Sequence, residues 1–489
     1  MSSILTNKSA MVALQTLKGI NASLSKTQGE ISTGMKVATA KDSSSIWAIS
    51  KVMESDVKGF KGISESLSLG ESTVAVARQG SETVTDLLTD IKSKIVAAQE
   101  QNVDRDKIQT DIKALRDQIT SVVNAAQFNG LNLLKGTEDV NILSSLDRAG
   151  DGSVSASNIT VARQDLSTTA GVLGSGTDLS PNATLSAAAA TNAGNTATVT
   201  IAADADMSDN ALTINVGGAT LNYSAGDFAA VDQDAAAAIV SGAINALGIV
   251  GVSAGVSGGV VTLTSTRAFE DVALTATGAT ASAATIAERA ENLTFSGSAN
   301  VAEGDGYQVS VGSNTFTYVA GKSETFEDVA KGLKAAVDGG AGADISTEVT
   351  QGSSGEWILK VDNDSASSVS LARAGAADGT ASGGLFGLDA IDVTTNTGAN
   401  SALSNVETLI NNSIDAAAAF GSAQGRIETQ ANFIGKLTDS LKAGIGTLVD
   451  ADMEEASARL QALQVQQQLG IQSLSIANQS PQSILSLFR

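Results

Sequence analysis

The sequence predicts a multidomain α+β protein in which both termini form a long antiparallel helical coiled-coil rod and duplicated β-rich modules are inserted in the middle. Three observations predict this fold. Apolar residues recur with three–four spacing in the first and last parts of the chain, which is typical of helices that pack against helices. Between these parts the period changes to two, with Gly, Asn and Asp at the turns, as in short strands. One stretch of this middle region also occurs twice.

Composition excludes several classes of function. The 489 residues suffice for two to four domains, and the net charge of −22 leaves no basic patch for nucleic acid. The chain has no cysteine and no histidine, which excludes disulfides, thiolate metal sites, histidine-based triads and zincin motifs. The Asp-rich stretches 204–209 and 362–364 lack the spacing of a calcium-binding loop and predict turns. We therefore expect no enzyme, no metal and no cofactor.

Targeting signals are absent from the sequence pattern. The first residues lack the continuous apolar core and cleavage site of a signal peptide. Residues 235–266 are uncharged, but their Ser, Asn and repeated Gly residues favour a helix followed by a strand over a membrane span. We expect neither a cleaved leader nor a membrane-spanning helix.

Residues 1–42 contain the first helical segment. Gly19 and Gly29 weaken this helix, and its apolar residues lie on one side, so it is marginal in isolation and needs a helical partner. Its near-heptad seam consists of Ala10, Met11, Leu14, Leu17, Asn21, Leu24 and Ile31.

Residues 43–170 carry the strongest helical period of the chain. The period from Met53 to Ala98 predicts a helix of roughly 70 Å. A break at 102–104 separates it from a shorter seam that ends at Phe128-Asn129-Gly130, so the two predict an antiparallel helical hairpin. Residues 140–166 have period two and predict a β-hairpin. The core candidates of these helices are Phe60, Leu67, Leu88, Ile91, Ile95, Ile112, Leu115 and Ile119.

Residues 171–290 and 291–398 are predicted to be two β-rich modules related by duplication. The stretch from Leu212 to Gly226 matches the stretch from Tyr307 to Gly321. A helix-like segment follows each copy, at 235–246 and at 325–337, and two strands follow each helix. Each module is therefore predicted to contain two strands, a helix and two strands.

The helical period returns in residues 399–449 and continues through residues 450–489. The first segment supplies the core candidates Ile427, Ile434 and Leu441. The second has a seam, broken by Gln467, that consists of Met453, Ala456, Leu460, Leu463, Gly470, Leu474 and Ala477. Chain ends are normally polar, so the apolar end of this one predicts burial against a partner. That end contains Ile484, Leu485, Leu487 and Phe488.

The motifs at both ends resemble those of bacterial flagellin. The resemblance covers about residues 1–165 and 400–489, and several ordered motifs make it specific. These motifs are Ile4-Leu-Thr-Asn7, Ser32-Thr-Gly34, Gln127-Phe128-Asn129-Gly130, Ala477-Asn-Gln-Ser-Pro481 and Ile484-Leu-Ser-Leu487.

The resemblance implies a structural protein and no enzyme. Such a subunit leaves the cell through the flagellar type III export channel and self-assembles into the extracellular bacterial flagellar filament, which drives swimming motility. Residues 1–42 and 450–489 would be its filament-core helices, residues 43–170 and 399–449 its rod, and the two β modules its outer region. The implied polymerisation interface consists of Met11, Leu14, Leu17, Leu24, Ile31, Leu460, Leu463, Leu474, Ile484, Leu485, Leu487, Phe488 and Arg489.

The resemblance also implies partners. They are further copies of the chain, a cytoplasmic export chaperone on residues 450–489, and the hook-associated and cap proteins. In many flagellins an arginine-bearing patch on the first rod helix is read by Toll-like receptor 5. Residues 88–99 here contain Asp90, Lys92 and Lys94 but no arginine, which argues against recognition by that receptor.

Two alternatives stay open at this stage. A hook–filament junction protein, which is a hook-associated protein, shares the terminal motifs but forms no long polymers. A surface adhesin would use the β modules for binding, and a secretion signal or a membrane anchor would favour it. Neither feature is visible in the sequence.

Overall fold

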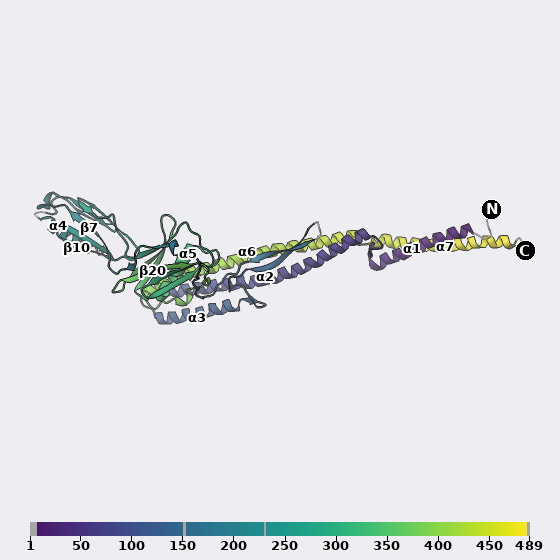
Figure 1. Ribbon diagram of the computed structural model, residues 1–489, viewed down its shortest axis with the longest axis horizontal. Coiled ribbons are helices and arrows are strands. Elements are labelled where there is room, and N and C mark those ends of the chain that lie inside the picture. Colours follow the sequence, from purple (N-terminus) through teal and green to yellow (C-terminus); the bar gives the residue numbers. More distant parts are fainter. Residues whose placement is uncertain (1–6, 150–152, 229–230, 487–489) are drawn as a thin grey trace. The chain divides into compact units, whose positions relative to one another are not determined.

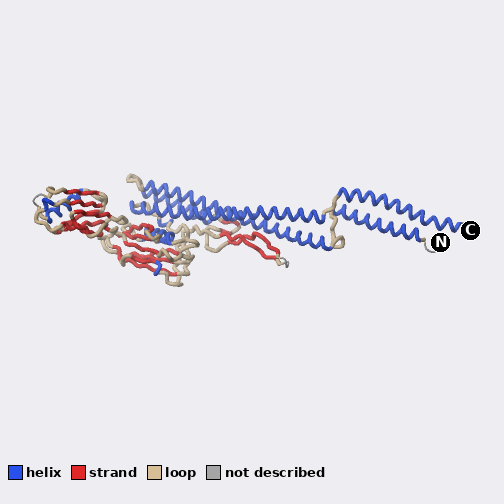
Figure 2. The backbone as a smooth tube through the Cα atoms, turned by 90° about the horizontal axis from the view of Figure 1, so that it is seen from above, coloured by secondary structure: helices blue, strands red, loops and turns tan. Residues whose placement is uncertain are grey.

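The computed structural model describes residues 7–149, 153–228 and 231–486, with side chains up to Gln479. It confirms the predicted fold class: long helices lie near both ends of the chain and short strands lie in its middle (Figures 1 and 2). The chain divides into two compact units. Unit 1 contains residues 1–71, 141–160 and 424–489, and unit 2 contains residues 72–140 and 161–423. We describe each unit by itself.

Unit 1 holds the two terminal helices, α1 (Lys8–Thr33) and α7 (Met453–Ser486). The side chain of Asn7 caps α1 by accepting a hydrogen bond from the amide of Ala10, and the helix ends at Gly34, whose φ is +70°. That left-handed conformation suits glycine. The two helices run side by side in both views (Figures 1 and 2).

Backbone hydrogen bonds tie the two helix connections of unit 1 together. The amides of Lys36 and Val37 both donate to the carbonyl of Val449, and the amide of Ala451 donates to the carbonyl of Gly34. The connection between α1 and α2 (Ser44–Ala98) is therefore fixed to the connection between α6 (Asn396–Val449) and α7.

The hairpin of β3 (Val140–Arg148) and β4 (Val154–Val161) packs on the N-terminal part of α2. Glycine makes this close contact possible: a Cβ atom at Gly70 would lie 2.5 Å from Cδ1 of Ile142. Arg148 also forms an ion pair of 2.5 Å with Asp56. Gly70 is therefore the contact point of the hairpin on α2.

We expect Gly70→Ala to destabilise unit 1 by about 1–3 kcal/mol, because the added methyl group overlaps Ile142. Gly62→Ala on the same helix is the matched control, because a Cβ atom at Gly62 meets nothing within 4 Å. It should stabilise the helix by about 0.5–1 kcal/mol. Unfolding followed by the fluorescence of Trp47 in a Trp357→Phe background measures both. Equal effects of the two variants would contradict the contact.

Unit 2 contains the C-terminal part of α2, helix α3 (Arg105–Ala125) and the N-terminal part of α6. Asp104 caps α3 by accepting from the amide of Lys107. The hydroxyl of Thr85 on α2 lies 3.0 Å from that of Ser413 on α6, and Ser413 donates to the carbonyl of Ser81. A tight turn follows α3, in which β1 (Gln127–Phe128) pairs with β2 (Leu131–Asn132) around Asn129 and Gly130, both at positive φ.

The predicted helical core residues occupy these helices as follows. Leu115 and Leu441 are half-buried. The buried members are Phe60, Leu67, Ile427 and Ile434 in unit 1, and Leu88, Ile91, Ile95, Ile112 and Ile119 in unit 2.

The first β module, in unit 2, consists of two four-stranded sheets and helix α4 (Gln233–Ala246) around one apolar core. Its sheets have the strand orders β10-β11-β7-β13 and β14-β12-β8-β9. The strands are β7 (Asn195–Ile201), β8 (Leu212–Val216), β9 (Ala219–Tyr223), β10 (Val252–Ser257), β11 (Val260–Ser265), β12 (Val272–Thr277), β13 (Ala279–Ala281) and β14 (Thr285–Ile286).

The second β module, also in unit 2, has the same plan around helix α5 (Phe326–Gly340) and its own core. Its sheets have the orders β18-β19-β15-β5 and β17-β16-β20-β6. The strands are β5 (Ala183–Leu185), β6 (Ala189–Ala190), β15 (Glu291–Phe295), β16 (Gly306–Val311), β17 (Asn314–Val319), β18 (Ile345–Gln351), β19 (Trp357–Asn363) and β20 (Val369–Ala376).

The modules exchange one strand pair. Residues 183–190, which the sequence analysis placed in the first module, form β5 and β6 and pair with strands β15 and β20 of the second. Residues 279–286 form β13 and β14 and complete the first module in the equivalent places. The two segments read Ala-Thr-Leu-Ser-Ala-Ala-Ala-Ala and Ala-Thr-Ala-Ser-Ala-Ala-Thr-Ile. Each repeat in the sequence therefore begins with a strand pair that folds into the module formed by the rest of the other repeat.

Candidate functional site: the terminal helix pair

Helices α1 and α7 pack along one narrow seam. The half-buried or buried residues of both helices recur at heptad spacing, and Leu17 lies against Gly470, where an added Cβ atom would be 3.1 Å from its Cδ1. On α1 the seam consists of Ala10, Ala13, Leu17, Ile20, Leu24, Thr27 and Ile31, and on α7 of Ala456, Leu460, Leu463, Gln467, Gly470, Leu474 and Ala477.

Two polar contacts set the register of this pair. The side chain of Gln467 donates a 2.7 Å hydrogen bond to Oδ1 of Asn21, and the side chain of Asn7 donates a 2.8 Å hydrogen bond to the carbonyl of Ala477. The sequence pattern predicts a break in the seam at Gln467. That interpretation was wrong, because Asn21 on the facing helix supplies the acceptor that makes a glutamine acceptable there.

Large apolar side chains outside the seam are exposed. Their exposed fractions lie between 44% and 68%, because two paired helices can each cover only one stripe. Full burial of one such side chain stabilises by about 1.5–3 kcal/mol, so this pair leaves much apolar surface available for a partner. The exposed residues are Met11, Val12, Leu14, Met453, Val465, Leu469, Ile471 and Ile476.

The predicted polymerisation residues fall into three groups. Met11 and Leu14 are exposed, and Met11, Val12 and Leu14 line a shallow hollow on α1. Six others lie in the seam: Leu17, Leu24, Ile31, Leu460, Leu463 and Leu474. The side chains of Ile484 and Leu485, and the whole of Leu487, Phe488 and Arg489, lie outside the described residues.

Sequence reasoning missed half of the exposed surface. On α1, Met11, Leu14 and Asn21 were predicted in the seam but are exposed, as is Met453 on α7. Val12, Val465, Leu469, Ile471 and Ile476 were not considered. The signal was present: these residues are apolar and do not belong to the heptad of the seam. Apolar residues on both the seam and another face of a helix indicate a second partner.

The charged side chains buried in unit 2 are held by ion pairs or by hydrogen bonds, as at Asp305, which accepts a hydrogen bond from the amide of Ala302. Arg289 pairs with Asp362, and Lys334 pairs with Asp338 at 2.5 Å. Among the residues that the structure describes, no group of three or more carboxylates is placed to hold a metal ion, and no helix has the length and apolarity needed to cross a membrane.

Glu324 is the buried carboxyl group with the most perturbed titration in unit 2. Burial raises its pKa to about 7, although the hydroxyl of Tyr318 and the amide of Gly321 donate hydrogen bonds to it. Because the folded-state pKa lies above the ordinary value of 4.5, the neutral form is favoured by folding. The contribution of the Glu324 carboxyl group to the stability of unit 2 is therefore present in acid and is lost as the pH rises through 7.

We expect unit 2 to lose about 3 kcal/mol of stability between pH 5 and pH 8 through this group. Glu324→Gln keeps the shape and cannot ionise, so it should remove this part of the pH dependence. Urea unfolding at both pH values, followed by Trp357 fluorescence in a Trp47→Phe background, measures the difference between the chain with Glu324 and the variant. Identical pH profiles of the two proteins would contradict the assignment.

Comparison with known proteins gives matches at both ends and over the full length. Residues 4–139 match the bacterial flagellin N-terminal helical region, and residues 403–488 match the bacterial flagellin C-terminal helical region. Flagellin A of Rhizobium meliloti is 31% identical over 497 residues, and flagellin D of Rhizobium meliloti strain 1021 is 32% identical over 499 residues. Each alignment covers 100% of both chains.

One similar solved structure is the flagellar hook-associated protein 3 of Legionella pneumophila, with 10% identity and a TM-score of 0.32. The alignment covers 81% of this chain and 98% of that one. A likeness this weak carries no argument about function, so it does not favour the junction-protein alternative.

The terminal helices are paired and have uncovered apolar faces, and the β modules lie between them in sequence. These features define a structural subunit that self-assembles. The full-length relatives identify the kind of assembly. The chain belongs to the bacterial flagellin family. It is a secreted, extracellular subunit of the flagellar filament and serves motility.

Proposed function

We propose that filament assembly is driven by the uncovered apolar faces of α1 and α7. One observation carries this proposal: Leu469, Ile471 and Ile476 on α7, and Met11 and Val12 on α1, are more than half exposed although they are large and apolar. Burial against neighbouring subunits would contribute about 25 cal/mol per Å² of apolar surface. The entropy of ordering the terminal segments offsets part of that gain.

The proposed division of labour follows the chain. Residues 1–42 and 450–489 would form the filament core, residues 43–170 and 399–449 the rod, and residues 171–398 the outer modules. The net charge of −22 supports a role of the outer modules in keeping the filament soluble. The chain would act without catalysis, since the sequence lacks histidine and cysteine, and the buried cations Arg289 and Lys334 of unit 2 are held in ion pairs.

The apolar C-terminal end provides the test of this proposal. Removing residues 484–489 should abolish polymerisation, because it removes Ile484, Leu485, Leu487 and Phe488. Helix content by circular dichroism should stay close to that of the intact chain, since α7 loses few residues. Light scattering after addition of filament seeds measures assembly. Normal filament growth from the shortened chain would refute the role of this end.

The seam face of α7 supports a proposed interaction with an export chaperone before export. If α1 is not yet paired, the seam of α7 from Ala456 to Ala477 is an apolar stripe interrupted by Gln467, which a helical groove could cover. We place the export chaperone on residues 450–489, and expect contacts with hook-associated and cap proteins at the ends of the filament. Recognition by Toll-like receptor 5 is not expected, since Lys92 pairs with Glu407 and Lys94 with Asp111, and residues 88–99 contain no arginine.

A further inference from the structure

A lysine, an aspartate and an asparagine form a closed set of hydrogen bonds between helices α5 and α6 of unit 2. Nζ of Lys334 donates at 2.5 Å to Oδ2 of Asp338 and at 3.0 Å to Oδ1 of Asn405. Nδ2 of Asn405 donates at 3.2 Å to the same Oδ2 of Asp338. Each of the three side chains therefore contacts the other two. We call these three residues the α5–α6 triad.

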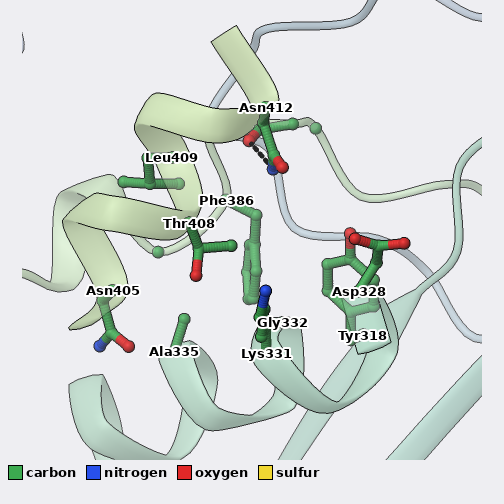
Figure 3. A pocket seen from close by; sticks show the side chains of 13 residues that line it. Tyr318, Asp328, Lys331, Gly332, Ala335, Phe386, Asn405, Thr408, Leu409 and Asn412 are labelled. Carbon is green, nitrogen blue, oxygen red and sulfur yellow. Dashed lines mark hydrogen bonds between the residues drawn. The ribbon is translucent and has the colours of Figure 1, made fainter. Parts of the chain in front are cut away.

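The triad joins parts of the chain that are distant in sequence. Lys334 and Asp338 lie on α5, and Asn405 lies on α6, 71 positions after Lys334. Figure 3 shows Asn405 and Thr408 of α6 next to Ala335 of α5, which follows Lys334 in sequence. The three side chains therefore meet only when the second β module has folded against α6.

The lysine and the aspartate of the triad are buried. The side chain of Lys334 is 8% exposed and that of Asp338 is 5% exposed. Removing two charges from water has a large desolvation cost. A proton that passes from Lys334 to Asp338 replaces the two charges with a neutral amine and a neutral carboxylic acid. A neutral lysine amine is a nucleophile.

The duplicated module shows that packing of the helix does not require this lysine. When the N-cap residues of α4 and α5 are aligned, Ser241 and Asn245 of α4 correspond to Lys334 and Asp338 of α5. The side chains of Ser241 and Asn245 both form hydrogen bonds with the backbone of Ala254 in their own module. A serine thus suffices at this buried position, and the lysine of the second module serves the contact with α6.

We propose that Lys334 and Asn405 become joined by an intramolecular isopeptide bond and that Asp338 moves the protons. Asp338 first takes a proton from Nζ of Lys334. The lone pair of Nζ then attacks Cγ of Asn405, the carbon bonded to the oxygen that Nζ already contacts. Asp338 gives its proton to Nδ2 of Asn405 and takes a second proton from Nζ. The bond between Cγ and Nδ2 breaks, and ammonia leaves.

This reaction balances without an added reactant. An ammonium group, a carboxylate and a carboxamide become a secondary amide, a carboxylic acid and ammonia, so that every atom and charge is accounted for. It occurs once in each chain and turns over no substrate. The bond therefore goes beyond the proposed role in the filament and does not make the chain an enzyme.

The surroundings of Asp338 suit both proton transfers. Its Oδ2 lies within hydrogen-bond distance of both Nζ of Lys334 and Nδ2 of Asn405, which is the geometry that a proton carrier needs. Thr347 on β18 donates a 2.5 Å hydrogen bond to Oδ1 and holds the carboxyl group in place. A cavity of about 300 Å³ lined by Asp338 and Asn405 leaves room for the departing ammonia.

Mass spectrometry of the folded full chain tests the proposal. We expect the chain to be lighter than its sequence by one molecule of ammonia. Trypsin does not cleave after a lysine whose Nζ is part of an amide, so the digest should contain residues 332–360 joined to residues 374–426. Lys331 on the same helix pairs with Glu327 and is 29% exposed, so it should be cleaved normally and serves as the internal control.

The joined peptide decides the outcome, because Asn129-Gly130 can also lose ammonia by closing to a succinimide. A folded chain that trypsin cleaves after Lys334, and that yields no joined peptide, overturns the proposal.

Asp338→Asn tests the role of the aspartate, because asparagine has the same size but cannot carry the proton. We expect the joined peptide to form about 10²–10⁴-fold more slowly, which is the usual contribution of a positioned acid or base. Glu327→Gln changes the corresponding partner of Lys331 and should leave the rate unchanged. Circular dichroism verifies the fold of both variants. Equal rates in the folded Asp338→Asn variant and in the chain with Asp338 overturn the role of Asp338.

Discussion

Replacing both Leu469 and Ile476 with aspartate is expected to abolish filament growth while the free subunit stays folded. Both side chains are exposed in the subunit and lie outside the seam between α1 and α7, so the substitutions disturb no intramolecular packing. In the assembled state each removes about 1.5–3 kcal/mol of apolar burial. Each also places a carboxylate where burial without a partner costs several kcal/mol.

Val172→Asp is the control for this prediction. Val172 is an equally exposed apolar residue, but it belongs to unit 2 and lies far from the terminal helices in sequence. Seeded assembly followed by sedimentation measures the polymerised fraction, and circular dichroism verifies the fold of each variant. If the Leu469/Ile476 variant polymerises as well as Val172→Asp, the exposed faces of the terminal pair do not drive assembly.

The second large effect is expected at a buried ion pair of the second β module. Asp362 on β19 is 1% exposed and accepts two hydrogen bonds from Arg289, at 2.8 Å and 2.6 Å. Asp362→Ala leaves a buried guanidinium without its main partner. Breaking such a pair costs about 3–5 kcal/mol, a large share of the stability of a domain.

Asp364→Ala is the matched control, because Asp364 also pairs with Arg289 but its side chain is 65% exposed. Exposed pairs contribute at most about 1 kcal/mol. The chain has two tryptophans, of which Trp357 lies in β19 of this module. Urea unfolding in a Trp47→Phe background therefore reports on the module alone. Equal losses in both variants would show that burial of the pair is unimportant.

The helices could be predicted because their periods are long and regular. α3, α4, α5 and the α6–α7 region were each expected close to their observed bounds, whereas α2 was expected from Met53 and begins at Ser44. The strands β7 and β10 were not expected. The Val, Ser, Ala and Gly residues of β10 alternate weakly in hydropathy, whereas β7 has a clear alternation of Ala197, Val199 and Ile201 with threonines that could have predicted it. The pairing of β5 and β6 with the second module could not be expected either, since strand partners depend on tertiary closure and short Ala-rich segments carry no register signal.

The seam of the candidate site could be predicted from the sequence, because its residues also follow a regular helical period, but the exposed faces could not. A heptad identifies the residues that face the nearest helix, so Leu17, Leu24, Leu460 and Leu474 were expected in a seam and lie in one. A filament needs a second set of contacts outside that seam. Residues such as Leu469 and Ile476 become visible as a set only when the intramolecular partner is in place and they are still exposed.

The most direct test of the terminal-helix account is negative-stain electron microscopy after seeded assembly, with the intact chain beside a chain that lacks residues 450–489. Deletion removes α7 and with it both the seam and the exposed α7 face. We expect long uniform filaments from the intact chain and none from the shortened one. Filaments from both chains would contradict the account, and an intact chain that caps the seeds without extending them would contradict it as well.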